Sequence, residues 1–291
     1  MTTDVILTHW KTDRSVHETA VRSAEGLVGK AVRGYVGYEE WPAIHMVRRE
    51  IARCGISLVL AFGDPVDVHD ANDSVRSLGA FAVGNQAKAT LTELGGHQHG
   101  VQVELTPAAA LGLFGKVGEL NNTVVPIDEA LGRWAVRLVD RLGNIATWAE
   151  RFALLDETFG ALELPEEGGV SPEVAWLRRQ LLRCGGRARV EPLMDETGRS
   201  RRFVTERFRT QLGVPPKAYA RILRFQRAVG LLAGLNAGRT LADVAIECGY
   251  YDQSHLNRDF VALAGCAPGT LMAESTKEPA VRFLQDNGIA G

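Results

Sequence analysis

The sequence predicts two domains, an α+β N-terminal domain followed by an all-α C-terminal domain. Its 291 residues, 45% of them hydrophobic, are enough for two separate cores. Three observations predict this order. Short β-prone runs give way to helical stripes along the chain, a segment rich in Gly, Glu and Pro comes next, and the part after it repeats itself at a spacing of 52 residues.

The N-terminal domain is predicted to begin with short strands and to end in helices. Residues 56–62 and 101–105 are β-prone runs bounded by Gly, Asp and Pro, and residues 79–94 have room for two more strands. From Pro107 the hydrophobic period becomes helical. Two amphipathic helices are expected, one with a stripe from Ile127 to Leu142 and one from Ile145 to Phe159, with a break near Gly143.

A linker separates the domains. Residues 160–172 hold paired glycines, paired glutamates and two prolines, which is typical of linkers. Ser171 and Pro172 then suit the N-cap and first position of a new helix. We therefore divide the chain into a sensing or dimerisation domain (1–160), a linker (161–172), a helical domain (173–275) and a tail (276–291).

Charge differs strongly between the two parts. Residues 1–172 carry 15 basic and 23 acidic side chains, whereas residues 173–291 carry 18 and 12. Between Trp176 and Arg239 there are 15 basic and 4 acidic residues, and all the basic ones but Lys217 are arginines. This pattern indicates either a polyanion partner for the C-terminal domain or a solvated helical surface.

Cysteine usage and hydropathy bear on the compartment. The four cysteines are far apart and form no C-x-x-C pair, so reduced thiols are expected. No run approaches the roughly 18 apolar residues of a membrane span, and the N-terminus lacks a signal-peptide pattern. The sequence predicts a cytoplasmic protein with no membrane partner.

The 52-residue repeat predicts two copies of one motif. It aligns Val204 with Leu256, Phe208 with Phe260, and Gly213 with Gly265. Each copy has a short helix, a turn at a glycine, a second helix and a Gly-x-x-Pro ending, which together predict a helix-turn-helix. Ser200 and Asp252 are suited to cap the second helices.

The second helix of each copy exposes polar side chains. Arg pairs with guanine edges and Gln or Asn with adenine edges in the major groove, so these faces suit DNA, although one polar helix face is also ordinary protein surface. The predicted DNA-contacting residues are Arg201, Arg202, Thr205, Glu206 and Arg209 in the first copy and Gln253, Ser254, Asn257 and Arg258 in the second.

Residues 171–273 resemble the DNA-binding domain of the AraC/XylS transcription regulators. The specific stretch is G-Y-x-D-Q-S-x-L-x-R-x-F at 249–260, followed by G-x-x-P. The resemblance implies a seven-helix domain whose two helix-turn-helix units are joined by a long helix, here about 216–235, and enter successive major grooves. On that helix Arg221, Arg224 and Arg227 are candidates either for phosphate contacts or for structural salt bridges.

Two residues of the first copy depart from the family pattern. Met194 stands where an alanine is usual, so this unit is expected to pack differently. Glu206 stands where a basic or neutral polar residue is common. A carboxylate can accept from cytosine but is repelled by phosphate, and Arg202 and Arg209 are its candidate partners.

For the N-terminal domain the resemblance implies effector binding or dimerisation, on a cupin-like barrel or a smaller α+β sheet. Trp41, Trp134 and Trp148 are pocket candidates, with Trp134 and Trp148 favoured as core residues because of their helical spacing. The alternative that this domain dimerises and senses nothing stays open.

His97 and His99 are weak candidates for metal ligands, because their spacing with Glu104 resembles the cupin H-x-H-x(4)-E. An unbulged strand places Glu104 on the opposite face, which favours a hydrogen-bonded or solvent-facing histidine pair. With no nucleophile elbow, Walker loop or dinucleotide fingerprint, an enzyme is not predicted, and no cofactor is expected. A cupin-like metalloenzyme fused to a DNA-targeting module is the alternative.

The sequence thus predicts a bacterial DNA-binding transcription regulator of the AraC type. Double-stranded DNA and RNA polymerase are the expected partners, a small-molecule effector and a homodimer are compatible with the N-terminal domain, and the operator sequence cannot be derived from the residues.

Overall fold

A computed structural model of the chain describes residues 5–11, 15–24, 28–42, 45–69, 75–162, 169–233 and 240–277. The chain forms two compact units. Unit 1 comprises residues 1–48, 55–84 and 90–169, and unit 2 comprises residues 49–54, 85–89 and 170–291. The predicted linker lies partly, and the predicted tail almost wholly, outside the described residues.

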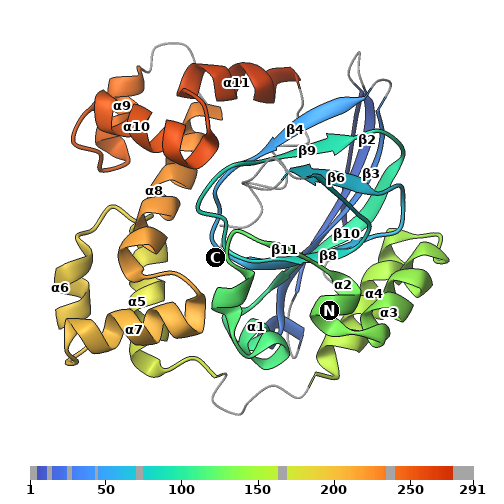
Figure 1. The fold of residues 1–291 in the computed structure, drawn as a ribbon, viewed down its shortest axis with the longest axis horizontal. Coiled ribbons are helices and arrows are strands. Elements are labelled where there is room, and N and C mark those ends of the chain that lie inside the picture. The colour runs from blue at the N-terminus through green and yellow to red at the C-terminus, as the bar shows by residue number, and fades with distance from the viewer. Residues whose placement is uncertain are drawn as a thin grey trace. The chain divides into compact units, whose positions relative to one another are not determined.

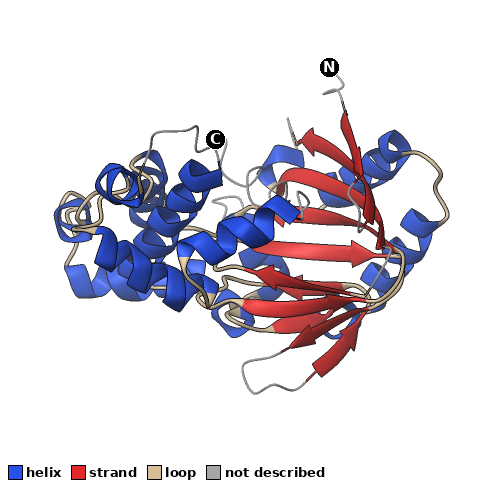
Figure 2. Cartoon of the chain, turned by 90° about the horizontal axis from the view of Figure 1, so that it is seen from above, coloured by secondary structure: helices blue, strands red, loops and turns tan. Residues whose placement is uncertain are grey.

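Unit 1 is built on two antiparallel sheets (Figures 1 and 2). The larger sheet has the strand order β1 (Ile6–Lys11), β2 (Ser15–Ser23), β3 (Val32–Pro42), β10 (Gln98–Leu105), β5 (Ile56–Ala61), β8 (Phe81–Val83) and β11 (Val124–Pro126). The smaller sheet has the order β4 (Met46–Glu50), β9 (Thr90–Leu94), β6 (Val66–His69) and β7 (Val75–Leu78). The predicted runs at 56–62 and 101–105 are β5 and most of β10, and the segment between them supplies β8 and β9.

The larger sheet packs its apolar face against helices. Side chains alternate between the faces of a strand, so Tyr35, Val101 and Val103 point to the same side. They are fully buried in a core that also contains Phe152 and Phe159. The covering helices are α1 (Pro107–Phe114), α2 (Ile127–Leu131), α3 (Arg133–Gly143) and α4 (Trp148–Gly160), with short 3-10 turns at Val28–Lys30 and Val117–Leu120.

The predicted helix from Ile127 to Leu142 is in fact two helices. Gly132 has φ +77°, a left-handed backbone that ends α2 and starts α3. The hydrophobic stripe continues across this break, so periodicity alone could not reveal it. The second predicted helix corresponds to α4, whose N-cap Thr147 accepts a hydrogen bond from the Glu150 amide.

The opposite face of the larger sheet carries buried polar groups. On β3, Glu40 Oε2 accepts a hydrogen bond from Arg48 Nη2 at 2.7 Å, and Glu40 Oε1 lies 3.4 Å from His17 Nδ1. Burial lowers the pKa of His17, more than the neighbouring Glu40 carboxylate raises it. Ion pairing and hydrogen bonds therefore offset the burial of these side chains.

Unit 2 is a bundle of helices, in agreement with the predicted all-α domain (Figure 1). In chain order these are α5 (Pro172–Arg183), α6 (Val190–Asp195), α7 (Arg201–Leu212), α8 (Pro216–Ala233), α9 (Leu241–Glu247), α10 (Gln253–Ala264) and α11 (Pro268–Lys277). None of the helices in the described ranges is long and apolar enough to span a bilayer.

Helix α8 belongs to both cores of unit 2. Its Tyr219 and Leu223 pack in one cluster with Phe208 of α7, whereas its Phe225 packs in the other with Phe260 of α10. The rings of Phe225 and Phe260 lie 4.9 Å apart, edge to face. One rigid helix therefore anchors both halves of the domain.

Two segments from the strand-rich part of the sequence complete unit 2. Ala52 is fully buried among the apolar residues of α8–α10, and its amide donates to the Leu263 carbonyl at 2.9 Å. Arg49 binds Glu274 on α11, and Asn85 Nδ2 donates to the Leu212 carbonyl at 2.8 Å. The helical unit is thus assembled from three stretches of chain.

Candidate functional site

The first helix-turn-helix unit consists of α6, the turn at Gly198 and α7. Gly198 has φ +69°, and the Ser200 side chain caps α7 by accepting from the Phe203 amide. Val204 and Phe208 are fully buried, as the repeat predicts. The face of α7 that remains exposed carries Arg201, Arg202, Glu206 and Arg209, while Thr205 is half-buried.

Most of the predicted groove residues of α7 already have partners within the unit. Arg201 makes a bidentate ion pair with Asp195, at 2.7 and 2.5 Å, and this contact lowers the pKa of Asp195. Arg209 Nη2 lies 3.1 Å from Glu206 Oε1. Of the two candidate partners of Glu206, the structure thus selects Arg209.

Met194, which departs from the family pattern, packs inside the first unit. It is buried in the core of this unit, and the Thr205 hydroxyl donates to its sulfur at 3.6 Å. Thr205 therefore faces the α6–α7 contact as much as it faces solvent.

Sequence reasoning missed one cluster on α7. Phe203 is 39% exposed, and the guanidinium groups of Arg199 and Arg207 lie 5.9 and 5.5 Å from its ring centre. Cations over an aromatic face are favourable contacts. Phe203 and Arg207 are four residues apart on one face of α7, whereas Arg199 precedes the N-cap Ser200, so only the contact between Phe203 and Arg207 was readable from helical spacing.

The second unit consists of α9, the turn at Gly249 and α10. Gly249 has φ +76°, and Asp252 caps α10 by accepting from the His255 amide at 2.7 Å. Leu256 and Phe260 are fully buried, which leaves the predicted polar residues on the outer face. Gln253, Ser254 and Arg258 are exposed and Asn257 is half-buried.

The outer face of α10 is less occupied than that of α7. Among the described residues Asn257 Oδ1 is buried and has no hydrogen-bond partner, and Arg258 Nε makes one long contact, 3.4 Å to the Ser254 carbonyl. The exposed Arg258 guanidinium can therefore bind a base edge directly, whereas Asn257 Oδ1 can do so only after its side chain rotates.

The three arginines of α8 make contacts inside the domain. Arg221 Nε binds the buried carboxylate of Asp259 on α10 at 2.8 Å. Arg227 lies 3.3 Å from Glu247 on α9, and the Arg224 guanidinium lies over the Tyr250 ring at 5.0 Å. These contacts hold α9 and α10 on α8, which corresponds to the structural-salt-bridge alternative.

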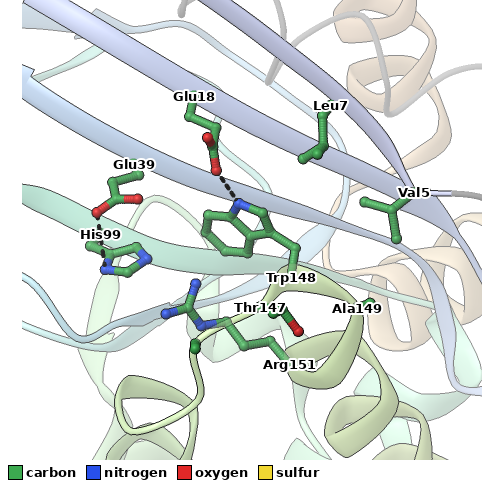
Figure 3. A pocket seen from close by; sticks show the side chains of 10 residues that line it. Val5, Leu7, Glu18, Glu39, His99, Thr147, Trp148, Ala149 and Arg151 are labelled. Carbon is green, nitrogen blue, oxygen red and sulfur yellow. Dashed lines mark hydrogen bonds and ion pairs between the residues drawn. The ribbon is translucent and has the colours of Figure 1, made fainter.

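Unit 1 contains a cavity of about 410 Å³ at the edge of the larger sheet (Figure 3). Trp148 at the start of α4 forms its wall, and its indole nitrogen donates to Glu18 on β2. Gly37 permits this close approach, because a Cβ there would lie 2.5 Å from the indole ring. The remaining lining residues are Val5, Leu7, Glu39, His99, Ala146, Thr147, Ala149 and Arg151.

Trp148 is thus both a core residue and a pocket residue. It is 7% exposed and belongs to the main core of unit 1, and its ring also receives the Arg151 guanidinium at 4.6 Å. Trp134 packs at the margin of that core. Trp41 is 46% exposed and stacks on His97 with ring centres 4.6 Å apart.

His97 and His99 lie together on the helix-covered face of the sheet. Glu39 Oε1 is 3.1 Å from His97 Nε2 and 3.7 Å from His99 Nδ1. Burial, together with the smaller effect of the nearby Arg151 charge, lowers the pKa of His99 to about 4, so this imidazole is neutral at neutral pH. Glu104 lies on the opposite face, where it accepts from Ser57 and Gln102.

Comparison with known proteins shows which family model the helical unit matches. Residues 193–274 match the family model of a helix-turn-helix domain. Among solved structures, ToxT from Vibrio cholerae is 10% identical with a TM-score of 0.43, and the match covers 79% of this chain and 97% of that chain. The DNA-binding domain of AdpA, a global transcriptional factor solved with a target DNA, is 25% identical with a TM-score of 0.34, over 38% and 99% of the chains. CuxR, an AraC-like transcriptional activator, is 13% identical with a TM-score of 0.33, over 97% and 90%. No curated protein matches.

The matched region contains α7, α8 and the whole of the second unit, and it defines the class of domain as a DNA-binding helix-turn-helix. This domain is of the AraC type, which confirms the resemblance seen in the sequence. The chain is a DNA-binding transcription regulator.

Proposed function

We propose that this regulator reads a specific operator by inserting α7 and α10 into successive major grooves of double-stranded DNA. The observation that carries the proposal is the structural repeat, in which two capped helices with exposed polar faces are anchored to the single helix α8. When two helix-turn-helix units read successive major grooves, the centres of the two DNA elements lie about one helical turn apart, roughly 34 Å or 10 base pairs.

Within this arrangement the two helices have different tasks. Gln253, Asn257 and Arg258 on α10 present amide and guanidinium groups that match adenine and guanine edges. On α7, Arg201 and Arg209 are paired with carboxylates, and each pair must open before its arginine binds DNA. We therefore assign the stronger base readout to α10, and a weaker base readout together with phosphate contacts to α7.

Control of this activity is assigned to unit 1. Its cavity combines an aromatic wall with a few charged groups, which is typical of small-molecule sites. In this proposal an effector enters the cavity, the protein acts as a homodimer, and the DNA-bound form contacts RNA polymerase in the cytoplasm.

The DNA proposal is tested by selecting bound sequences from a random library with the full-length chain. The full chain is needed because residues 49–54 and 85–89 form part of unit 2. We expect an enriched motif with two elements about 10 base pairs apart. A single element, or no enrichment, would contradict readout by both helices.

The effector proposal is tested by thermal denaturation across a panel of metabolites. A ligand that binds only the folded protein raises the Tm. The rise should disappear when Ala146, which lines the cavity, is replaced by Phe. If no compound raises the Tm of the wild-type chain, the effector proposal is contradicted.

A further inference from the structure

Two histidines and one glutamate converge on the helix-covered face of the larger sheet. Their ligand atoms, one from each of Glu39, His97 and His99, all lie within 4.8 Å of one another. Residues 97 and 99 are two apart along the chain, and Glu39 is the registered partner of His99 across β3 and β10. Strand pairing therefore fixes the three side chains on one face.

The spacing of these atoms suits a first-row divalent ion. Zinc–nitrogen and zinc–oxygen bonds of about 2.0 Å in a tetrahedron place ligand atoms roughly 3.3 Å apart. The two contacts that Glu39 Oε1 makes with the histidines, at 3.1 and 3.7 Å, bracket this value. Only small side-chain rotations are needed for all three groups to reach one ion.

The surroundings hold the histidines in place and leave a side of the cluster open. Trp41 stacks on His97, and Phe62 contacts the His99 ring edge to face at 4.4 Å. Among the described residues His99 Nε2 is buried without a hydrogen-bond partner. Glu39 and His99 also line the 410 Å³ cavity, where water or a ligand atom can complete a coordination sphere (Figure 3).

The charge around the cluster is compatible with a cation. Among the described residues Arg151 is a positive group close to His99, and the carboxylates of Glu18 and Glu39 both act on it. Trp148 and Phe62 hold the Arg151 guanidinium over their rings, and its Nε donates to the Leu142 carbonyl. Two carboxylates against one guanidinium leave a net negative charge before an ion enters.

We propose that Glu39, His97 and His99 bind one divalent transition-metal ion, with Zn²⁺ as the best match to a donor set of two imidazoles and one carboxylate. The ion lies between the sheet and the start of α4, on the face opposite the buried Glu40 and Arg48. This site is independent of the DNA-binding proposal, because its test involves no DNA.

The test uses the full-length chain after treatment with a chelator and dialysis. Co²⁺ is titrated and its visible absorption recorded, and Zn²⁺ is then added as a competitor. We expect one Co²⁺ per chain, displaced by one Zn²⁺. Loss of a residue that only orients a metal ligand commonly costs roughly 10–100-fold in metal affinity, so His97→Ala and Glu39→Gln, which remove direct ligands, should cost at least that much.

A matched control lies elsewhere in the same unit. His45 and His69 flank Glu93, at 3.7 and 2.7 Å, and do not form such a three-ligand cluster. The double variant His45→Ala/His69→Ala should bind Co²⁺ like the wild type. Circular dichroism establishes that each variant is folded. No Co²⁺ binding by the wild-type chain, or equal binding by folded His97→Ala and wild type, would overturn the proposal.

Discussion

Helices α7 and α10 occupy equivalent places in the 52-residue repeat, yet their exposed side chains are held differently. On α7, Arg201 and Arg209 are each paired with a carboxylate of the same unit. On α10, Arg258 makes one long contact to a backbone carbonyl, and Asn257 Oδ1 has no partner among the described residues. Two units with the same backbone arrangement can therefore differ in whether the arginines on the exposed helix form ion pairs within the unit.

The largest expected effect tests what the two units have in common. Phe208→Ala and Phe260→Ala each remove a fully buried ring from a core that includes α8, and each should lower the free energy of unfolding by about 3–5 kcal/mol. Chemical denaturation monitored by circular dichroism measures this loss. Tyr251→Ala is the control, because Tyr251 is 91% exposed and its removal should change stability by less than about 0.5 kcal/mol. A loss below about 1 kcal/mol in either Phe variant would break the equivalence of the two cores.

The next effect tests the difference between the units. Arg258→Ala should weaken binding to the selected operator by about 1–3 kcal/mol and leave binding to random DNA nearly unchanged. Arg202→Ala on α7 is the matched variant, and it should weaken both kinds of binding alike. Fluorescence anisotropy with labelled duplexes measures both affinities. If Arg258→Ala lowers both affinities equally, α10 contacts phosphates rather than bases.

Capping gives a smaller and more symmetrical effect. Ser200→Ala and Asp252→Ala each remove the side chain that accepts an amide hydrogen at a helix start, so each should cost about 1 kcal/mol of stability. Replacement by Thr should restore most of the loss. Thermal denaturation of the four variants tests this, and an unchanged Tm in an alanine variant would show that the cap does not stabilise its helix.

The smallest effect concerns Glu206. Glu206→Gln should release Arg209 and raise affinity for all DNA by several-fold, because an exposed ion pair contributes less than about 1 kcal/mol. The salt dependence of binding should also steepen as one more arginine reaches a phosphate. Glu196→Gln on the turn makes the same charge change and should give a smaller gain. Equal gains would mean that only net charge matters.

Local patterns predicted the helical unit well. The repeat located both second helices and their caps, because hydrophobic spacing and capping act over a few residues of sequence. The break at Gly132 was missed, because the apolar stripe crosses it unchanged. The contacts of Phe203 with Arg199 and Arg207 were not predicted either, although the three residues are close in sequence.

Long-range pairing accounts for the features that local patterns could not predict. Glu39 lies 60 residues before its registered partner His99, whereas Glu104, five residues after His99, is on the wrong face. The same holds for Ala52 and Asn85, which join helices far along the chain. The metal-binding role of His97 and His99 stays a prediction. The assignment of residues that contact DNA also stays a prediction.

Because α8 contributes side chains to both cores, its length fixes the distance and the rotation between α7 and α10. Each residue added to an α-helix lengthens it by about 1.5 Å and rotates the chain beyond the insertion by about 100°. In the proposed DNA complex, an insertion in α8 would therefore rotate α10 out of alignment with its major groove while α7 stays in its own. In that proposed complex, substitutions on the exposed face of one helix would change the bases that this helix reads, whereas a change in the spacing between the two operator elements would require both cores to repack.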